Sequence, residues 1–249
     1  MGIARIWKAY IFHTIVDQYG DTPYFQAGRG FLDGVVRPAY DDDQAIYMDM
    51  LNELEEGIAQ IGGSSTLGGA DLVFNGDTNK WKKFGNSLML RLAMRIKNVD
   101  PSASNAWAQK AINGGTMSSS DDTAFMTHTD GPTNLNRNAW GIYQPRYSNA
   151  RIGATLYDWL AINNDPRLNI LADPAGPAAG NRFGLEKDKL LSIYGETTAS
   201  YARVNPAITK LDSPWVFLSY AQTSLLEAEF AASAGNHSTA ETKYNDGVR

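Results

Sequence analysis

The chain has 249 residues, enough to bury a sizeable hydrophobic core, with 43% apolar residues and a formal net charge of −5. This acidic balance argues against a nucleic-acid partner, and no apolar run approaches the roughly 18 to 20 residues that cross a bilayer. The absence of cysteine excludes disulfides, thiolate metal sites and cysteine nucleophiles.

Four helices are predicted before residue 115, because apolar residues recur there at spacings of three and four positions. Gly20 ends the first helix, and Asp41 to Asp43 supply the N-cap and first-turn acids of the second. Pro101 stops the third helix. The four predicted ranges are about 3–19, 41–61, 80–99 and 104–113.

The turn after the first helix, VDQYGDTPYF at 16–25, mixes turn formers with aromatic residues. Gly20 can adopt a positive φ, and Asp21 can accept hydrogen bonds within the turn. Its role is predicted to be structural. We expect its three aromatic residues, Tyr19, Tyr24 and Phe25, to pack the turn against neighbouring helices.

The middle of the chain, 116–212, is rich in Gly, Pro, Asn, Ser and aromatic residues, and only 152–163 has a helical pattern. Loops of this length in a compact domain usually carry function. A later helix is predicted to start with Ser213 as N-cap and to end at Gly235. The sequence STAE at 238–241 is typical of a capping box that opens a last helix.

Two segments fit the tetratricopeptide pattern, in which small residues let two antiparallel helices approach and large ones fill the gaps. The alternative is any other tight helical hairpin. The first segment uses Trp81, Phe84, Gly85 and Leu88 with Ala108 and Ile112, and the second uses Ala228, Ala231 and Gly235 with Ala240 and Tyr244.

Taken in order, five motifs of this chain resemble the SusD/RagB family of outer-membrane lipoproteins. They are YIFHTIVDQYGDTPYF, PAYDDDQAIYMDMLNELEEG, FNGDTNKWKKFGNSLMLRLAMRI, NDPRL and VFLSYAQTSLLEAEFAASAG. The resemblance implies a mostly all-α fold of tetratricopeptide-like hairpins with long irregular loops. We expect one domain over 1–249, a fragment without the family's lipidated amino terminus and carboxyl-terminal portion.

The resemblance also implies a function without catalysis. Proteins of this family capture glycans or other nutrients at the extracellular face of the outer membrane. They deliver these ligands to a SusC-like TonB-dependent transporter. No enzyme activity and no cofactor is expected, and contact with the membrane would need a lipid anchor that this chain lacks.

A candidate ligand surface lies in the predicted loop Asn134–Asn149. Sugars present apolar C–H faces and a fringe of hydroxyls, so their sites favour exposed aromatic rings flanked by polar side chains. The alternative is that these aromatic residues only anchor the loop to the helices. The candidate ligand-binding residues are Trp140, Tyr143, Tyr147, Arg146 and Asn138.

Other functions have weaker support in the sequence. The histidines are scattered and there is no cysteine, so no metal site is expected. A helical glycoside hydrolase would need two carboxylates across a cleft, and Asp158, Asp165 and Glu186 could supply them. A cytosolic tetratricopeptide scaffold that binds peptides would explain the hairpins but leaves the loop-rich middle unexplained.

Overall fold

The computed structural model describes residues 1–63, 67–133, 136–146, 150–181, 195 and 197–248. The chain divides into two compact units. Unit 1 comprises Met1–Phe125 and Val216–Arg249, and unit 2 comprises Met126–Trp215. The expectation of one domain over 1–249 stays a prediction, and each unit is described below by itself.

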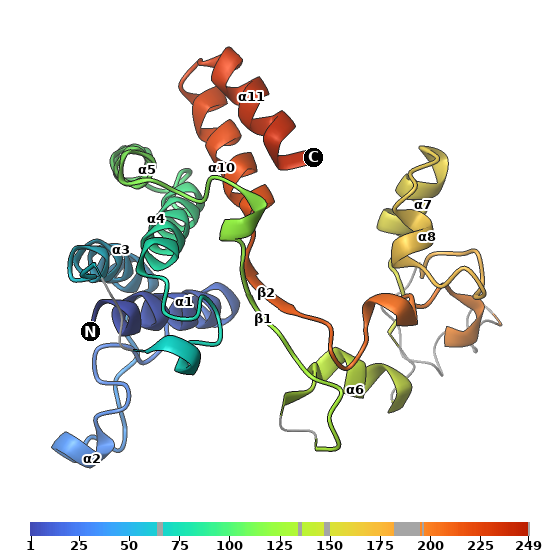
Figure 1. Cartoon of the computed structure of the whole chain (residues 1–249), viewed down its shortest axis with the longest axis horizontal. Coiled ribbons are helices and arrows are strands. Elements are labelled where there is room, and N and C mark those ends of the chain that lie inside the picture. The colour runs from blue at the N-terminus through green and yellow to red at the C-terminus, as the bar shows by residue number, and fades with distance from the viewer. Residues whose placement is uncertain (64–66, 134–135, 147–149, 182–194, 196, 249) are drawn as a thin grey trace. The chain divides into compact units, whose positions relative to one another are not determined.

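Unit 1 is built from helices that pack in a row, as Figure 1 shows. The order of contact is α1 with α3, α3 with α4, and α4 with both α5 and α10, which in turn packs on α11. The mostly helical class expected from the sequence is therefore confirmed. The bounds are α1 (Gly2–Tyr19), α3 (Asp43–Ala59), α4 (Thr78–Arg95), α5 (Pro101–Gly114), α10 (Tyr220–Ser233) and α11 (His237–Val248).

Both predicted helical hairpins are present and antiparallel. In the first, Asn86 at the middle of α4 donates from Nδ2 to the carbonyl of Gly114, at the end of α5, over 2.8 Å. In the second, Gly247 near the end of α11 lies against Ala221 and Leu225, near the start of α10. Close approach at a glycine is what a tight helical pair requires.

The core of unit 1 centres on α4. Trp81, Phe84 and Leu88 are buried there, as the tetratricopeptide pattern predicts. A Cβ on Gly85 would lie 2.8 Å from Ile58 Cγ1 and 3.0 Å from Ile6 Cδ1. The predicted close contact at Gly85 is therefore confirmed, but it is made with α3 and α1 instead of α5.

Aspartates begin three of these helices. Asp42 accepts from the amide of Ala45 at the start of α3, and Asp77 and Asp100 do the same for α4 and α5. Side-chain oxygens here satisfy amide groups that have no partner within the helix. The first turn of each helix is thus fixed by a residue visible in the sequence.

The turn after α1 follows the prediction in part. Gly20 has a φ of 70°, and Asp21 accepts from the amide of Asp43. Tyr24 is buried and donates from its hydroxyl to Asp49 over 2.7 Å. The expectation for Tyr19 is wrong, because its side chain is 75% exposed, and Phe25 is also half exposed. Only one of the three aromatic rings is enclosed by the turn.

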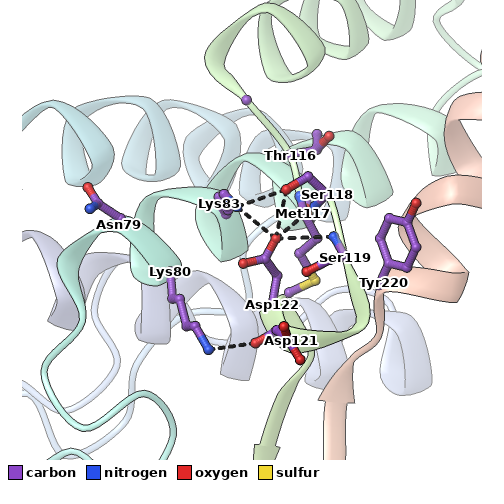
Figure 2. Close-up of polar contacts among 12 residues, drawn as sticks. Asn79, Lys80, Lys83, Thr116, Met117, Ser118, Ser119, Asp121, Asp122 and Tyr220 are labelled. Atoms are coloured by element: carbon purple, nitrogen blue, oxygen red, sulfur yellow. Dashed lines mark hydrogen bonds and ion pairs between the residues drawn. The ribbon is translucent and has the colours of Figure 1, made fainter.

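The segment after α5 is held against α4 by the carboxylate of Asp122, which is buried. Figure 2 shows Lys83 donating to it, together with the amide and hydroxyl of Ser118. Lys80 also donates to the carbonyl of Asp121, over 2.6 Å. These bonds fix the 3-10 turn η2 (Ser120–Asp122) ahead of strand β1.

The helix predicted from Ser213 is wrong at its start. Strand β2 (Trp215–Leu218) occupies this position and pairs with β1 (Ala124–Met126). Its aromatic and β-branched residues favour a strand, and the preceding proline does not by itself specify a helix. α10 instead begins after Ser219, whose hydroxyl accepts from the amide of Gln222.

The capping box predicted at STAE is also wrong. α11 begins at His237, and the side chain of Asn236 accepts from the amide of Thr239. Tyr244, expected to fill the hairpin, is 56% exposed. The close contact of α11 with α10 that the structure shows is made at Gly247.

Unit 2 contains short helices joined by long irregular segments, as the composition predicts. Its small core is formed by Ile152, Ala172 and Ala202. The segments that carry them are joined by the isolated bridges Arg151–Arg203 and Ala172–Val204. Within the described residues, no helix is both long and apolar enough to span a lipid bilayer. The α-helices that the structure describes in unit 2 are α6 (Ala139–Arg146), α7 (Ala154–Ile162) and α8 (Leu168–Leu171).

Candidate functional site

Helix α6 lies inside the segment that was predicted to be a loop, 134–149, so that part of the prediction is wrong. It begins after Asn138, whose Oδ1 accepts from the amide of Trp140 over 2.8 Å. Asn138 is only 4% exposed. This residue was predicted to bind ligand directly, and the structure shows it capping the helix that carries the aromatic residues.

Helix α6 is seated on the segment 210–213. The backbone amide of Asn138 donates to the carbonyl of Leu211 over 2.7 Å. The side-chain Nδ2 of Asn138 donates to the carbonyl of Ser213 over 2.9 Å. A Cβ on Gly141 would lie 2.6 Å from the carbonyl oxygen of Lys210. The helix therefore lies directly on this backbone, and glycine is needed for the approach.

Two aromatic rings project from α6. Trp140 is 47% exposed and Tyr143 is 43% exposed, and their rings meet edge to face with centroids 5.7 Å apart. Each ring thus braces the other while keeping a large part of its surface free. Tyr147 and the side chain of Arg146 lie outside the described residues.

A cavity of about 610 Å³ lies beside the same helix, lined by Gly141 and Gln144. Its lining is polar in part: Arg203 pairs with the carboxylate of Asp173 over 2.5 Å, and Gln144 Nε2 has no hydrogen-bond partner among the described residues. The remaining lining residues are Asp130, Val204, Pro206, Thr209, Lys210, Leu211 and Asp212.

This arrangement has the chemistry of a site for a neutral polar ligand. Trp140 and Tyr143 are each followed in α6 by a residue that lines the cavity, so the rings and the cavity lie on adjoining flanks of one helix. Apolar C–H faces can stack on the rings, and hydroxyl groups can meet the carboxylates, amide and cations of the cavity.

Two of the carboxylates considered for a glycosidase lie in the described part of the chain, Asp158 within α7 and Asp165 shortly after it. Asp165 is bound by its neighbour Arg167 over 2.6 Å, and these hydrogen bonds lower the pKa of Asp165 to about 2. A group that is ionised at neutral pH cannot serve as the general acid. Glu186 lies outside the described residues.

One cluster of three acidic side chains in unit 1 has the spacing of a metal site. Among described residues with acidic, imidazole or thiol side chains, only Asp21, Asp42 and Asp43 bring three such groups within 4.8 Å of one another. All three are exposed, and two of them already accept backbone hydrogen bonds at the start of α3. Capping explains this trio.

Most of the cavity wall was not predicted from the sequence. The segment 203–212 lines the cavity, but its residues are about 60 positions from α6 and follow no period. Gly141 was a visible signal, since a glycine inside a helix costs stability unless something approaches it closely. What approaches it is fixed only by the fold.

The comparisons with known proteins agree on one family. Residues 1–249 match the SusD-like family that is described as "Starch-binding associating with outer membrane". Among curated proteins none matches this sequence.

Among solved structures, a chitin-binding protein is 30% identical with a TM-score of 0.80, over 99% of this chain and 54% of its own. A SusD-like protein from Bacteroides thetaiotaomicron is 28% identical with a TM-score of 0.80, over 100% of this chain and 51% of its own. A SusD homologue from Bacteroides uniformis is 26% identical with a TM-score of 0.80, over the same shares. The chain thus spans about half the length of these structures, and it belongs to the SusD-like family that its motifs resemble.

Proposed function

We propose that this chain binds oligosaccharides at the outer membrane, without hydrolysing them, and passes them to a TonB-dependent transporter. The observation that carries the proposal is the pair of half-exposed rings, Trp140 and Tyr143, beside the 610 Å³ cavity of unit 2. Burial of both rings would have favoured the alternative, in which they only anchor the segment.

The family supports this choice of ligand. Its description names starch binding and association with the outer membrane, and a structure 30% identical to this chain is a chitin-binding protein. Both ligands are neutral glycans. The site matches them in kind, since it offers ring faces and hydrogen-bonding groups in place of a dominant charge.

Within the proposed site the residues have different tasks. Trp140 and Tyr143 stack on sugar rings, and Tyr147 and Arg146 are proposed as ligand-binding residues from the sequence alone. Asn138 positions the two rings, because its side-chain amide caps α6 and joins that helix to the segment 211–213. The cavity residues select hydroxyl patterns.

Affinity electrophoresis tests the ligand class. The whole chain is run in native gels that contain soluble starch or glycol chitin, beside a reference protein of similar charge. We expect retardation by at least one of these glycans. Equal mobility in all gels, at glycan levels that retard known binders, would overturn the proposal.

A second assay tests the absence of catalysis. Incubation with the retarding glycan should release no reducing ends above the level of the heat-treated chain. Steady release that scales with protein concentration would show an enzyme and would refute the binding-only role.

Delivery of the glycan to a transporter and the location at the cell surface are tested in whole cells. In a host that makes this protein, the polypeptide should co-purify with a TonB-dependent transporter and be digested by protease added to intact cells. Protection from protease in intact cells, combined with digestion after lysis, would contradict the extracellular face.

A further inference from the structure

The loop that joins the turn after α1 to α3 carries a cluster of unusually exposed apolar side chains. Phe31 is 99% exposed, Leu32 is 80% exposed and Val36 is 82% exposed. Phe31 and Leu32 lie in the short helix α2 (Gly30–Asp33), which projects from the rest of unit 1 in Figure 1. We call residues 29–37 the apolar tip.

The stem beneath the apolar tip is firmly held. Thr22 and Asp41 exchange two backbone hydrogen bonds, and the carboxylate of Asp41 accepts from the amides of Tyr24 and Phe25. Gln26 accepts from the amide of Ala39 across the loop. The exposed side chains therefore lie on a loop whose two ends are held together by hydrogen bonds.

The apolar tip also differs in charge from the rest of the chain. Its charged residues are Arg29, Asp33 and Arg37, two positive and one negative, for a local net charge of +1 against −5 for the whole protein. Arg29 and Asp33 form an ion pair one helical turn apart. The second arginine, Arg37, has an exposed side chain with no partner among the described residues.

The size and shape of the tip favour a lipid surface over a protein. A stable protein interface buries about 800 Å² on each partner, and the three apolar side chains that project here supply only part of this area. Insertion of a few apolar residues between headgroups requires no matching surface. Basic residues beside them attract anionic lipid headgroups, and each contributes about 1 kcal/mol to the free energy of membrane binding.

We propose that the apolar tip inserts into the interface of an anionic membrane, with Phe31 and Leu32 as the inserted side chains and Arg37 at the headgroups. This contact would be additional to any covalent anchor. It concerns unit 1 alone and is independent of the glycan site in unit 2.

Vesicle co-sedimentation tests the proposal with the whole chain. The vesicles are phosphatidylcholine with roughly one third phosphatidylglycerol, and pure phosphatidylcholine for comparison. We expect binding to the mixed vesicles that falls roughly tenfold or more in the double variant Phe31→Ser/Leu32→Ser. The matched control, Leu156→Ser/Ile162→Ser in α7, also removes two exposed apolar side chains and should bind as the wild type does.

A labelling experiment measures insertion directly, because this chain has no cysteine that would also react with the dye. An environment-sensitive dye on Leu32→Cys should brighten and shift to the blue with the mixed vesicles, whereas the same dye on Ile162→Cys should not change. Arg37→Gln should weaken binding to the mixed vesicles only. If wild-type protein does not sediment with vesicles and the Leu32→Cys dye stays unchanged, the lipid proposal is overturned, and the tip would instead fit a protein partner.

Discussion

Replacing Gly141 by alanine should loosen the seat of α6. The new Cβ would lie 2.6 Å from the carbonyl oxygen of Lys210 and 2.7 Å from the amide nitrogen of Leu211. Both are backbone atoms, which cannot rotate away, so the helix must move by several tenths of an ångström. Such overpacking costs about 1 to 3 kcal/mol, offset by about 0.5 to 1 kcal/mol from replacing glycine within a helix.

Middle values of about 2 and about 0.75 kcal/mol leave a net loss of about 1 kcal/mol, which should appear as local opening. The amide of Asn138, which donates to the carbonyl of Leu211, should exchange its hydrogen about 5 times faster in Gly141→Ala. Hydrogen exchange followed by mass spectrometry measures this for the peptide that spans α6.

Gly131→Ala is the matched control in the same unit. The nearest atom to its added Cβ is a threonine hydroxyl at 3.6 Å, an ordinary contact, so exchange across α6 should not change. Unchanged exchange in Gly141→Ala, or the same acceleration in both variants, would refute the packing argument for α6.

Three further predictions concern unit 1. Gly85→Leu should lower the free energy of unfolding by about 1 to 3 kcal/mol in urea titrations, because even a Cβ there approaches Ile58 within 2.8 Å. Asp71→Ala should cost about 2 to 4 kcal/mol by the same method, since the carboxylate accepts from Trp81 Nε1 and three backbone amides. Burial lowers the pKa of His13, so its contribution to stability should be complete above about pH 6.5 and be lost as the pH falls below that value. The midpoint of urea unfolding should therefore fall on acidification, with a shallower slope in His13→Gln.

Much of unit 1 could be predicted because its information is local. Asp42, Asp77 and Asp100 cap their own helices, and Gly20 ends α1 with a positive φ. These signals lie within four residues of what they determine. The resemblance of the motifs to a known family then predicted how the elements pack, which local signals alone do not determine.

The errors arise where a distant partner decides the structure. Trp215 to Leu218 form a strand because β1 is available to pair with it. A helix N-cap predicted at Ser213 from nearby residues could not reveal this pairing. Tyr19 is exposed, whereas Tyr24 is buried and bonded to Asp49, a residue 25 positions further along the chain. The tetratricopeptide spacing located Gly85 at a close contact but not the helices that make it.

The candidate site was predictable only in part for the same reason. Composition pointed to Trp140 and Tyr143, and both rings are half exposed. The cap formed by Asn138 and the cavity wall at 203–212 depend on hydrogen bonds that join segments about 70 residues apart. Polar residues in a loop can be recognised from the sequence, but whether they face a ligand or hold the backbone cannot.

The most direct test of the proposed glycan site compares two tryptophans of unit 2 by isothermal titration calorimetry. The ligand is an oligosaccharide of the glycan that retards the wild-type chain. Trp140→Ala should weaken binding by about 1 to 3 kcal/mol, as expected for a stacking residue. Trp159→Ala, which removes an equally exposed ring from α7, should leave the affinity unchanged. Wild-type affinity in Trp140→Ala, or an equal loss in both variants, would contradict a glycan site on α6.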